Sequence, residues 1–184
     1  MKKNKTPPTP KSITAEWIRK QKAPYFGVEA YFYHLVRNRG NQDTMTLVRG
    51  LPPGYVLIYL FWRFYTDVQN GGFWQFLGNT YAIDKSQQVV VETVETLDRV
   101  GMPELAVLLK KSIAVLGGHL PKRVLAILPS AERQKAAKRR PSDDQIQSGM
   151  DPIDAAFNRM ELSSFPKFDE YIKQHPEEFI HGDK

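Results

Sequence analysis

Histidines and paired carboxylates are the side chains of this 184-residue chain that could do acid–base or metal chemistry. No histidine has the spacing of a His-Glu-x-x-His or paired Glu-x-x-His ligand set. Glu92 and Glu95 lie three residues apart in an expected helix, where a solvated helix face is commoner than a catalytic pair. The sequence therefore predicts no catalytic residues and no metal site. The four histidines are His34, His119, His175 and His181.

Sulfur and nucleotide chemistry have no support in the sequence. The chain has no cysteine, which excludes a disulfide scaffold, a thiolate zinc site, an iron–sulfur cluster and a cysteine nucleophile. Gly71-Gly72 lacks the Lys, Ser or Thr of a phosphate-binding loop, and no nucleophile elbow or dinucleotide fingerprint occurs. No cofactor is expected.

Membrane contact is also not expected. The longest apolar run, from Tyr55 to Trp62, is far shorter than the roughly 20 residues that cross a bilayer. The Lys-rich first residues run into Pro7, Pro8 and Pro10 instead of an apolar signal core. Because the lack of cysteine also fits a reducing compartment, we expect a cytoplasmic protein.

The net charge of +6 is unevenly distributed along the chain. Residues 1–22 carry seven Lys or Arg against Glu16, residues 131–140 carry five against Glu132, and residues 141–184 carry ten acidic against four basic residues. The basic segments either are solvated and bind nothing, or bind nucleic-acid phosphates weakly and with strong salt dependence. Phosphate binding is the alternative functional interpretation. Its contacts would be Lys2, Lys3, Lys5, Lys11, Lys138, Arg139 and Arg140.

Apolar spacing and the positions of Pro and Gly predict helices along most of the chain. A nearly all-apolar helix should run from Gly54 to about Gln69, and Asn70-Gly71-Gly72 should separate it from a short helix that begins at Phe73. Asp84 is an expected N-cap. No segment alternates with period two for long, so the predicted fold class is all-α. Prolines open the later helices: Pro103, Pro121, Pro166 and Pro176.

Aromatic residues are concentrated between Tyr55 and Tyr81, which hold ten of the 21 in the chain. Their spacing predicts a core made by a central pair of aromatic-rich helices. The alternative is a surface on which a partner docks, since Tyr and Trp often anchor interfaces. Base stacking is less favoured, because Arg63 is the only basic residue among them.

The domain organisation follows from where apolar residues are missing. Residues 1–11 have no apolar residue after Met1 that could dock them, so they are predicted to form a flexible basic leader. Residues 12–184 are expected to form one compact multi-helix domain. Residues 130–150 contain few apolar side chains besides alanines and Ile146, and are predicted to be a mobile excursion on its surface.

The segment from Asp67 to Asn79, DVQNGGFWQFLGN, resembles the signature of a bacterial family of uncharacterised helical domains that includes an acidic DNA-mimic protein. The resemblance extends from about Leu47 to Phe179. It implies an all-α, non-enzymatic protein that binds a protein partner, and a dimer for its best-known kind of member. The residues that carry over, with an expected structural role, are Asn70, Gly71, Gly72, Phe73, Gln75 and Asn79.

The charge of this chain departs from DNA mimicry. Ten base pairs of duplex DNA, about 34 Å long, present about 20 negative charges. This chain has 20 acidic residues in all and 26 basic ones, so only the acidic segment 141–184 could present a local DNA-like patch. We therefore expect a regulatory or neutralising protein-interaction module, with the partner unidentified and the oligomeric state open.

Overall fold

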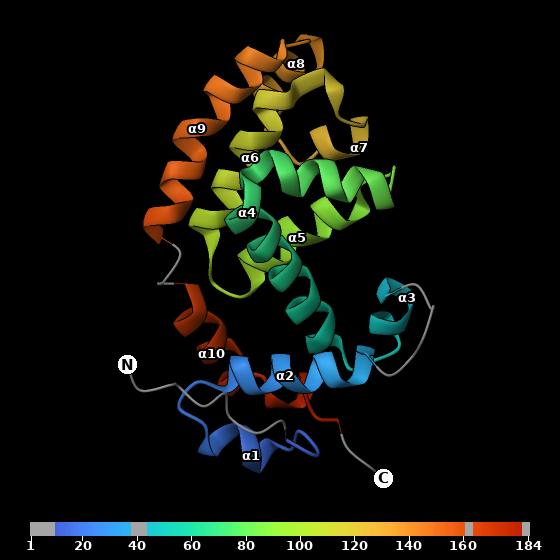
Figure 1. The fold of residues 1–184 in the computed structure, drawn as a ribbon, viewed down its shortest axis with the longest axis vertical. Helices are drawn as coiled ribbons and strands as arrows, with labels where there is room; N and C mark the ends of the chain where they lie inside the picture. Colours follow the sequence, from blue (N-terminus) through green and yellow to red (C-terminus); the bar gives the residue numbers. More distant parts are fainter. Residues whose placement is uncertain (1–9, 38–43, 161–163, 182–184) are drawn as a thin grey trace. The chain divides into compact units, whose positions relative to one another are not determined.

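The computed structural model describes residues 10–37, 44–160 and 164–181 (Figure 1). These residues are mostly helical, and their one β pairing is an isolated bridge between Ile13 and His181. The all-α prediction is confirmed. No described helix is long and apolar enough to cross a bilayer. The α-helices are α1 Ala15–Lys20, α2 Pro24–Arg37, α3 Thr44–Arg49, α4 Pro53–Ile83, α5 Gln88–Arg99, α6 Pro103–Leu116, α7 Lys122–Leu125, α8 Ser130–Lys138, α9 Asp143–Met160 and α10 Ser164–Gln174, with 3-10 turns η1 Gly117–His119 and η3 Pro176–Glu178.

The chain divides into two compact units. Unit 1 is made of two segments, Met1–Tyr59 and Phe165–Lys184, whereas unit 2 is the continuous stretch Leu60–Ser164. Helix α4 therefore begins in unit 1 and continues in unit 2. The expected single domain over residues 12–184 stays a prediction, as does the flexible leader, of which residues 1–9 lie outside the described residues.

Aromatic side chains from both segments build the core of unit 1. The hydroxyl of Tyr55, in the first turns of α4, donates to the carbonyl of Phe179 over 3.0 Å. The hydroxyl of Tyr31 in α2 lies 3.0 Å from Nδ1 of His181. Helix α1 packs against η3, and α2 against α3. The two segments of unit 1 thus share one core.

The first turn of α2 is capped by a residue from the end of the chain. Oδ1 of Asp169, in α10, accepts a hydrogen bond from the backbone N–H of Tyr25 over 2.8 Å. This satisfies one of the N–H groups that a helix N-terminus leaves without an intrahelical partner. Burial raises the pKa of the Asp169 carboxyl, while this hydrogen bond and nearby Lys173 act in the opposite direction.

Helix α6 is the centre of unit 2. It packs against α5, α8 and α9, and Leu105, Leu109 and Ile113 on its inner face are buried, as their spacing predicts. The short helix α7 packs against α5, α6 and α8. Helix α6 begins at Pro103 and ends at Gly117, where the Pro and Gly signals in the sequence place its bounds.

The two halves of α4 meet through aromatic rings. The Phe64 ring lies 5.7 Å from that of Phe73 and 5.3 Å from that of Phe76, and Phe157 of α9 lies 6.0 Å from both Phe64 and Phe73. The predicted aromatic core is confirmed for most of the cluster. Its buried members are Tyr55, Tyr59, Phe61, Phe64, Phe73 and Phe76.

Residues 130–150 fold as α8 and the first turns of α9. Both helices pack against α6, and Ala136, Ile146 and Met150 are buried. Ala136 anchors α8 despite its small side chain, because its backbone lies close against Gly117 in η1. The mobility predicted for this stretch stays a prediction. The polar stretch before Pro52 also contains a helix, α3.

Candidate docking site

The kink that precedes the candidate site is set by a glycine pair inside α4. Gly71 has an extended φ of −163° that any residue can adopt, whereas Gly72 has φ 73°, in the left-handed region that favours glycine. A Cβ at Gly72 would also collide with the carboxylate of Asp154. The backbone therefore requires glycine at the second position of the pair.

The helical segment after the kink is capped from α9. Oδ1 of Asp154 accepts a hydrogen bond from the backbone N–H of Phe73 over 2.9 Å. Burial raises the pKa of the Asp154 carboxyl, the Phe73 hydrogen bond lowers it, and the negative charge of Asp151 raises it further. The site thus begins on a helix end that a residue far along the chain holds in place.

Side chains on either side of the kink also pair. Nδ2 of Asn79 donates to Oδ1 of Asp67 over 2.9 Å, and Nη2 of Arg63 lies 3.4 Å from the Asn79 carbonyl oxygen. These bonds join the two halves of α4 one turn or more from the bend. They support the structural role expected of Asn79 in the motif. Asn70 is exposed, and the side chain of Gln75 lies close to Gly71.

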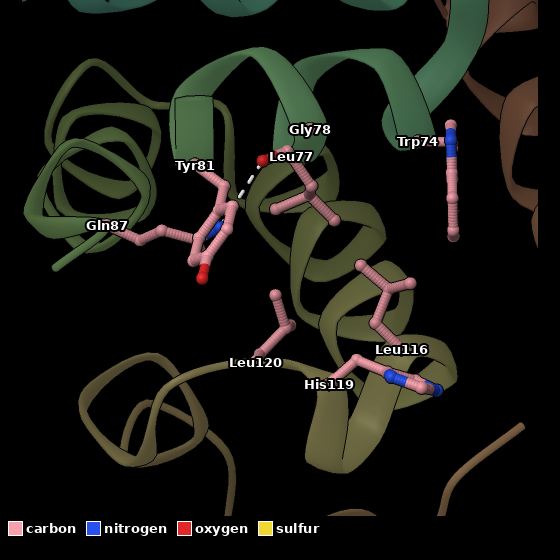
Figure 2. Close-up of a pocket in the computed structure, with 8 residues that line it drawn as sticks. All are labelled: Trp74, Leu77, Gly78, Tyr81, Gln87, Leu116, His119 and Leu120. Atoms are coloured by element: carbon pink, nitrogen blue, oxygen red, sulfur yellow. Dashed lines mark hydrogen bonds between the residues drawn. The ribbon is translucent and has the colours of Figure 1, made fainter. Parts of the chain in front are cut away.

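A cavity of about 200 Å³ lies beside the second half of α4 in unit 2. Trp74, Gly78 and Tyr81, spaced along one face of the helix, line it together with η1 (Figure 2). Trp74 is 46% exposed and Tyr81 48%, so both rings are accessible at the edge of the cavity. We call this cavity the Trp74–Tyr81 pocket. Its lining is Trp74, Leu77, Gly78, Tyr81, Gln87, Leu116, His119 and Leu120.

Gln87 supplies the buried polar atom of the pocket. Its Nε2 donates to the Leu77 carbonyl over 3.3 Å, whereas its Oε1 is buried and has no hydrogen-bond partner. The residue is 1% exposed, and its φ of 50° is left-handed, which is uncommon for a non-glycine residue. The turn from Asp84 holds it there, since Gln87 N donates to the Asp84 carbonyl over 2.9 Å.

The N-cap of α5 is Gln87, so the prediction of Asp84 as the N-cap is wrong by three residues. The Asp84 carboxylate still serves the start of the helix, because its Oδ2 accepts from the N–H of Gln88 over 2.8 Å and its Oδ1 from the N–H of Ser86 over 2.9 Å. Burial raises the pKa of the Asp84 carboxyl, but the hydrogen bonds from Ser86, Gln88 and Val89 outweigh it and leave that pKa lowered.

Basic side chains lie next to the pocket on its η1 side. Nε2 of His119 lies 3.1 Å from the Pro141 carbonyl oxygen, and the Gly118 N–H donates to the Arg139 carbonyl over 3.1 Å. The guanidinium of Arg140 lies so close over Gly118 that a Cβ there would collide with it. Since a carbonyl only accepts, Nε2 of His119 carries the hydrogen of this contact.

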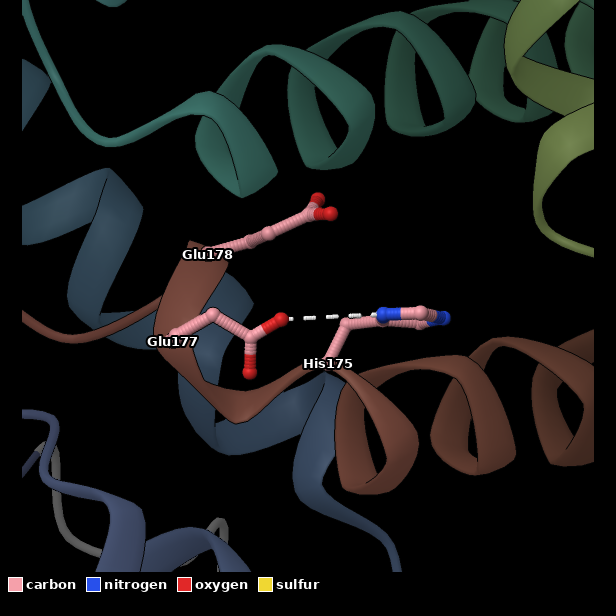
Figure 3. Close-up of side chains that lie close together, drawn as sticks. All are labelled: His175, Glu177 and Glu178. Atoms are coloured by element: carbon pink, nitrogen blue, oxygen red, sulfur yellow. Dashed lines mark ion pairs between the residues drawn. The ribbon is translucent and has the colours of Figure 1, made fainter.

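A second group of candidate ligands lies in unit 1. Ligand atoms of His175, Glu177 and Glu178 lie within 4.8 Å of one another (Figure 3). Each side chain already has a partner: Nδ1 of His175 lies 3.7 Å from Glu177, and both carboxylate oxygens of Glu178 accept from the Tyr171 hydroxyl, over 3.1 and 3.0 Å. The predicted absence of a metal stays a prediction.

The residues of the alternative interpretation fall in separate places. Lys2, Lys3 and Lys5 lie outside the described residues, and Lys11 belongs to unit 1. In unit 2, Lys138 ends α8, and Arg139 and Arg140 follow it. Arg139 and Arg140 are exposed, but each guanidinium also donates to backbone carbonyls, Ala114 for Arg139 and Ala137 for Arg140.

The sequence predicts a core for the aromatic cluster that includes Trp74 and Tyr81, with a docking surface as the alternative. Buried Phe73, Phe76 and Leu77 follow the core prediction, whereas Trp74 and Tyr81 are exposed. No local signal marks Gln87, because its burial depends on α4 and η1.

The fold and the pocket define a helical protein with an aromatic, partly exposed concave surface. A family model described as DMP19-like protein matches residues 49–175, which is more than half of the chain. The chain therefore belongs to the DMP19-like family, as its resemblance to a DNA-mimic-like helical family predicts. No curated protein and no solved structure matches the chain significantly.

Proposed function

We propose that this protein is a non-enzymatic protein-interaction module of the cytoplasm, with a regulatory or neutralising role. The observation that carries the proposal is the Trp74–Tyr81 pocket, in which two half-exposed aromatic rings flank an apolar cavity. Aromatic side chains of this kind supply much of the binding energy of protein interfaces. Membership of the DMP19-like family supports the same function class.

The side chains of classical acid–base chemistry support a non-enzymatic protein as well. Three of the four histidines have partners within the fold: His119 with Pro141, His175 with Glu177 and His181 with Tyr31. Glu92 accepts from Nε2 of Gln88 over 3.0 Å. Each of these contacts stabilises the fold. None of them pairs a general base with a nucleophile.

The acidic segment 141–184 gives DNA mimicry little support in this chain. Two of its carboxylates, Asp154 and Asp169, cap backbone N–H groups, and a third, Glu178, accepts from a tyrosine hydroxyl. Carboxylates committed to the fold are poorly placed to imitate a row of exposed phosphates. The exposed acidic residues of the segment are divided between unit 2 (Asp143, Asp144 and Asp151) and unit 1 (Glu170 and Glu177). We assign the interaction surface to the pocket, where the exposed aromatic rings lie.

Affinity capture from a bacterial lysate tests the proposed function. The full chain, immobilised through a C-terminal tag, is incubated with lysate before and after nuclease treatment. We expect a protein partner that remains bound after nuclease and at moderate salt. Material that is lost with nuclease would contradict this function and favour phosphate binding by the basic segments.

A further inference from the structure

The size of the Trp74–Tyr81 pocket limits what can occupy it. Sites for cofactors and drug-sized ligands have volumes of roughly 300 to 1,000 Å³. The pocket, at about 200 Å³, is smaller and matches one large side chain. Its walls are mainly apolar, and no Asp, Glu, Lys or Arg lines it, so the part of the occupant that enters should be apolar or aromatic.

The buried amide of Gln87 adds a requirement for a hydrogen-bond donor. Leaving a buried acceptor without a partner costs free energy, and so does holding a non-glycine residue in the left-handed region. Both costs occur at Gln87. An N–H or O–H group on the occupant would satisfy Oε1 and remove the first of them.

Tyr81 lines the pocket together with Gln87. It lies one helical turn after Leu77, whose carbonyl accepts from the Gln87 amide (Figure 2). Tyr81 is about half exposed, so its side chain can turn toward solvent at little cost in packing. Such a rotation opens Oε1 to a donor that enters from the pocket.

The surroundings of the pocket favour a segment of a protein over a free small molecule. A ligand confined to the cavity would leave Trp74 and Tyr81 half exposed at its edge, whereas a bound segment would cover both rings. Arg140 lies over Gly118, next to His119 of the pocket lining, and Arg139 is exposed beside it. These guanidinium groups would attract carboxylates on the segment and repel a basic one.

We propose that the Trp74–Tyr81 pocket binds the tryptophan or tyrosine side chain of an acidic segment in a partner protein. The indole N–H or phenol O–H donates to Oε1 of Gln87, the ring fills the cavity between Trp74 and Leu116, and flanking carboxylates face Arg139 and Arg140. The proposal rests on the proposed function, since it names the chemistry of the partner that the module binds.

Gly78 offers a way to block the pocket without harming the fold. A Cβ at Gly78 would meet no atom within 4 Å, and the residue is helical, so Gly78→Leu adds a side chain in open space within the pocket lining. Leucine also favours a helix over glycine. The matched control is Ile83→Ser, on the same helix at a residue that is 69% exposed and does not line this pocket.

The experiment is a titration of the full-length protein with short peptides. Binding is measured by heteronuclear NMR, as shifts of the backbone amide of residue 78 and of the side-chain amide of Gln87. The main probe is acetyl-Glu-Glu-Trp-Glu-Glu-amide, with a tyrosine version beside it. Three variants of the main probe carry phenylalanine, 1-methyltryptophan, or lysines in place of the glutamates. N-acetyltryptophanamide represents the free small molecule.

We expect the acidic tryptophan peptide to shift the pocket resonances in the wild type and in Ile83→Ser, and not in Gly78→Leu. The phenylalanine and 1-methyltryptophan peptides should bind about tenfold more weakly, because neither has a donor for Oε1. The lysine peptide should also bind more weakly, and the loss should shrink as salt is added.

Other outcomes would overturn the proposal. These are a lack of shifts at millimolar peptide, equal binding by Gly78→Leu, equal binding of the 1-methyltryptophan peptide, or N-acetyltryptophanamide binding as well as the peptide. Lysate capture with Gly78→Leu separates the two claims. A partner retained equally by wild type and Gly78→Leu would leave the proposed function in place and refute the pocket, whereas absence of any nuclease-resistant partner would refute the proposed function.

Discussion

The backbone N–H of Phe73 donates to Oδ1 of Asp154 over 2.9 Å, although the two are 81 positions apart in the sequence. Asp169 and Tyr25, 144 positions apart, form the same kind of contact in unit 1. In both cases a carboxylate from a later helix takes the place of the local N-cap. The helix that carries the docking pocket is thus held by a residue in α9.

Replacing Asp154 tests this cap. Asp154→Ala should lower the free energy of unfolding by about 1 kcal/mol, because Phe73 loses its acceptor. Asp154→Asn should have a much smaller effect, since asparagine caps nearly as well and keeps an acceptor oxygen. Urea unfolding followed by circular dichroism measures both. Equal losses in the two variants would contradict a capping role.

The pH dependence of stability should also change at this position. Because burial raises the pKa of Asp154 in the folded state, its ionisation opposes folding. Its contribution is therefore most favourable below the unfolded-state pKa, near 4, and declines as pH rises through the raised folded-state pKa. The stability of Asp154→Asn relative to wild type should rise between pH 4 and 7. Glu95→Gln, at an exposed position, is the control for loss of one charge; parallel curves for wild type and Asp154→Asn would refute the effect.

The two glycines of the kink should respond differently to alanine. Gly72→Ala places a Cβ at a left-handed φ and against the Asp154 carboxylate, so it should cost about 1 to 3 kcal/mol. At Gly71, whose φ lies outside the left-handed region, a Cβ would meet the Gln75 side chain, both its amide end, which can turn aside, and its Cβ. Gly71→Ala should therefore cost less than Gly72→Ala, about 1 kcal/mol or less. Similar costs at both positions in thermal unfolding would disprove this assignment.

Removal of residues 1–11 should leave the melting temperature within about 1 °C of the full chain, because this stretch has no apolar side chain after Met1 to bury. Ile13, two residues further on, is fully buried, and its N–H donates to the His181 carbonyl over 2.8 Å. Ile13→Ala should cost about 2 to 4 kcal/mol. A large destabilisation on truncation alone would show that the leader is docked.

Addition of Zn²⁺ should not raise the melting temperature. To bind a metal, Glu178 would have to give up its hydrogen bonds from Tyr171, and His175 its contact with Glu177. Thermal scans with ZnCl₂ and with EDTA, on wild type and His175→Ala, provide the measurement. A saturable rise that disappears in His175→Ala would establish a metal site here.

Local patterns in the sequence were sufficient for the helices but not for the contacts between them. The stops at Gly101 and Gly117 and the start at Pro103 depend on backbone preferences within a few residues, and the structure has them where expected. In residues 130–150 the contacts with α6 and η1 are made partly by alanine and glycine, whose close packing hydrophobicity alone does not indicate.

The candidate site was less predictable than the fold. The Asp154 carboxylate caps the Phe73 N–H because α9 passes close to the kink. No local pattern in the sequence predicts that proximity. The same is true of Gln87, whose unpartnered oxygen depends on burial by distant segments. The motif did predict the bend at Gly71-Gly72, since positive φ has a direct residue signature.

The division of unit 1 between the two ends of the chain determines when it can form during protein synthesis. Unit 2, from Leu60 to Ser164, is complete on the growing polypeptide before Phe165 has been added. The earlier segment of unit 1 cannot pack against the later one until about a hundred further residues have been synthesised. Their synthesis takes about 5 to 20 seconds at ribosomal rates. During that interval Tyr25 lacks the ring of Phe168 and Tyr55 lacks the ring of Phe179, against which they pack in the folded protein. Chaperones that recognise exposed aromatic segments would therefore find their target in the nascent residues before Leu60.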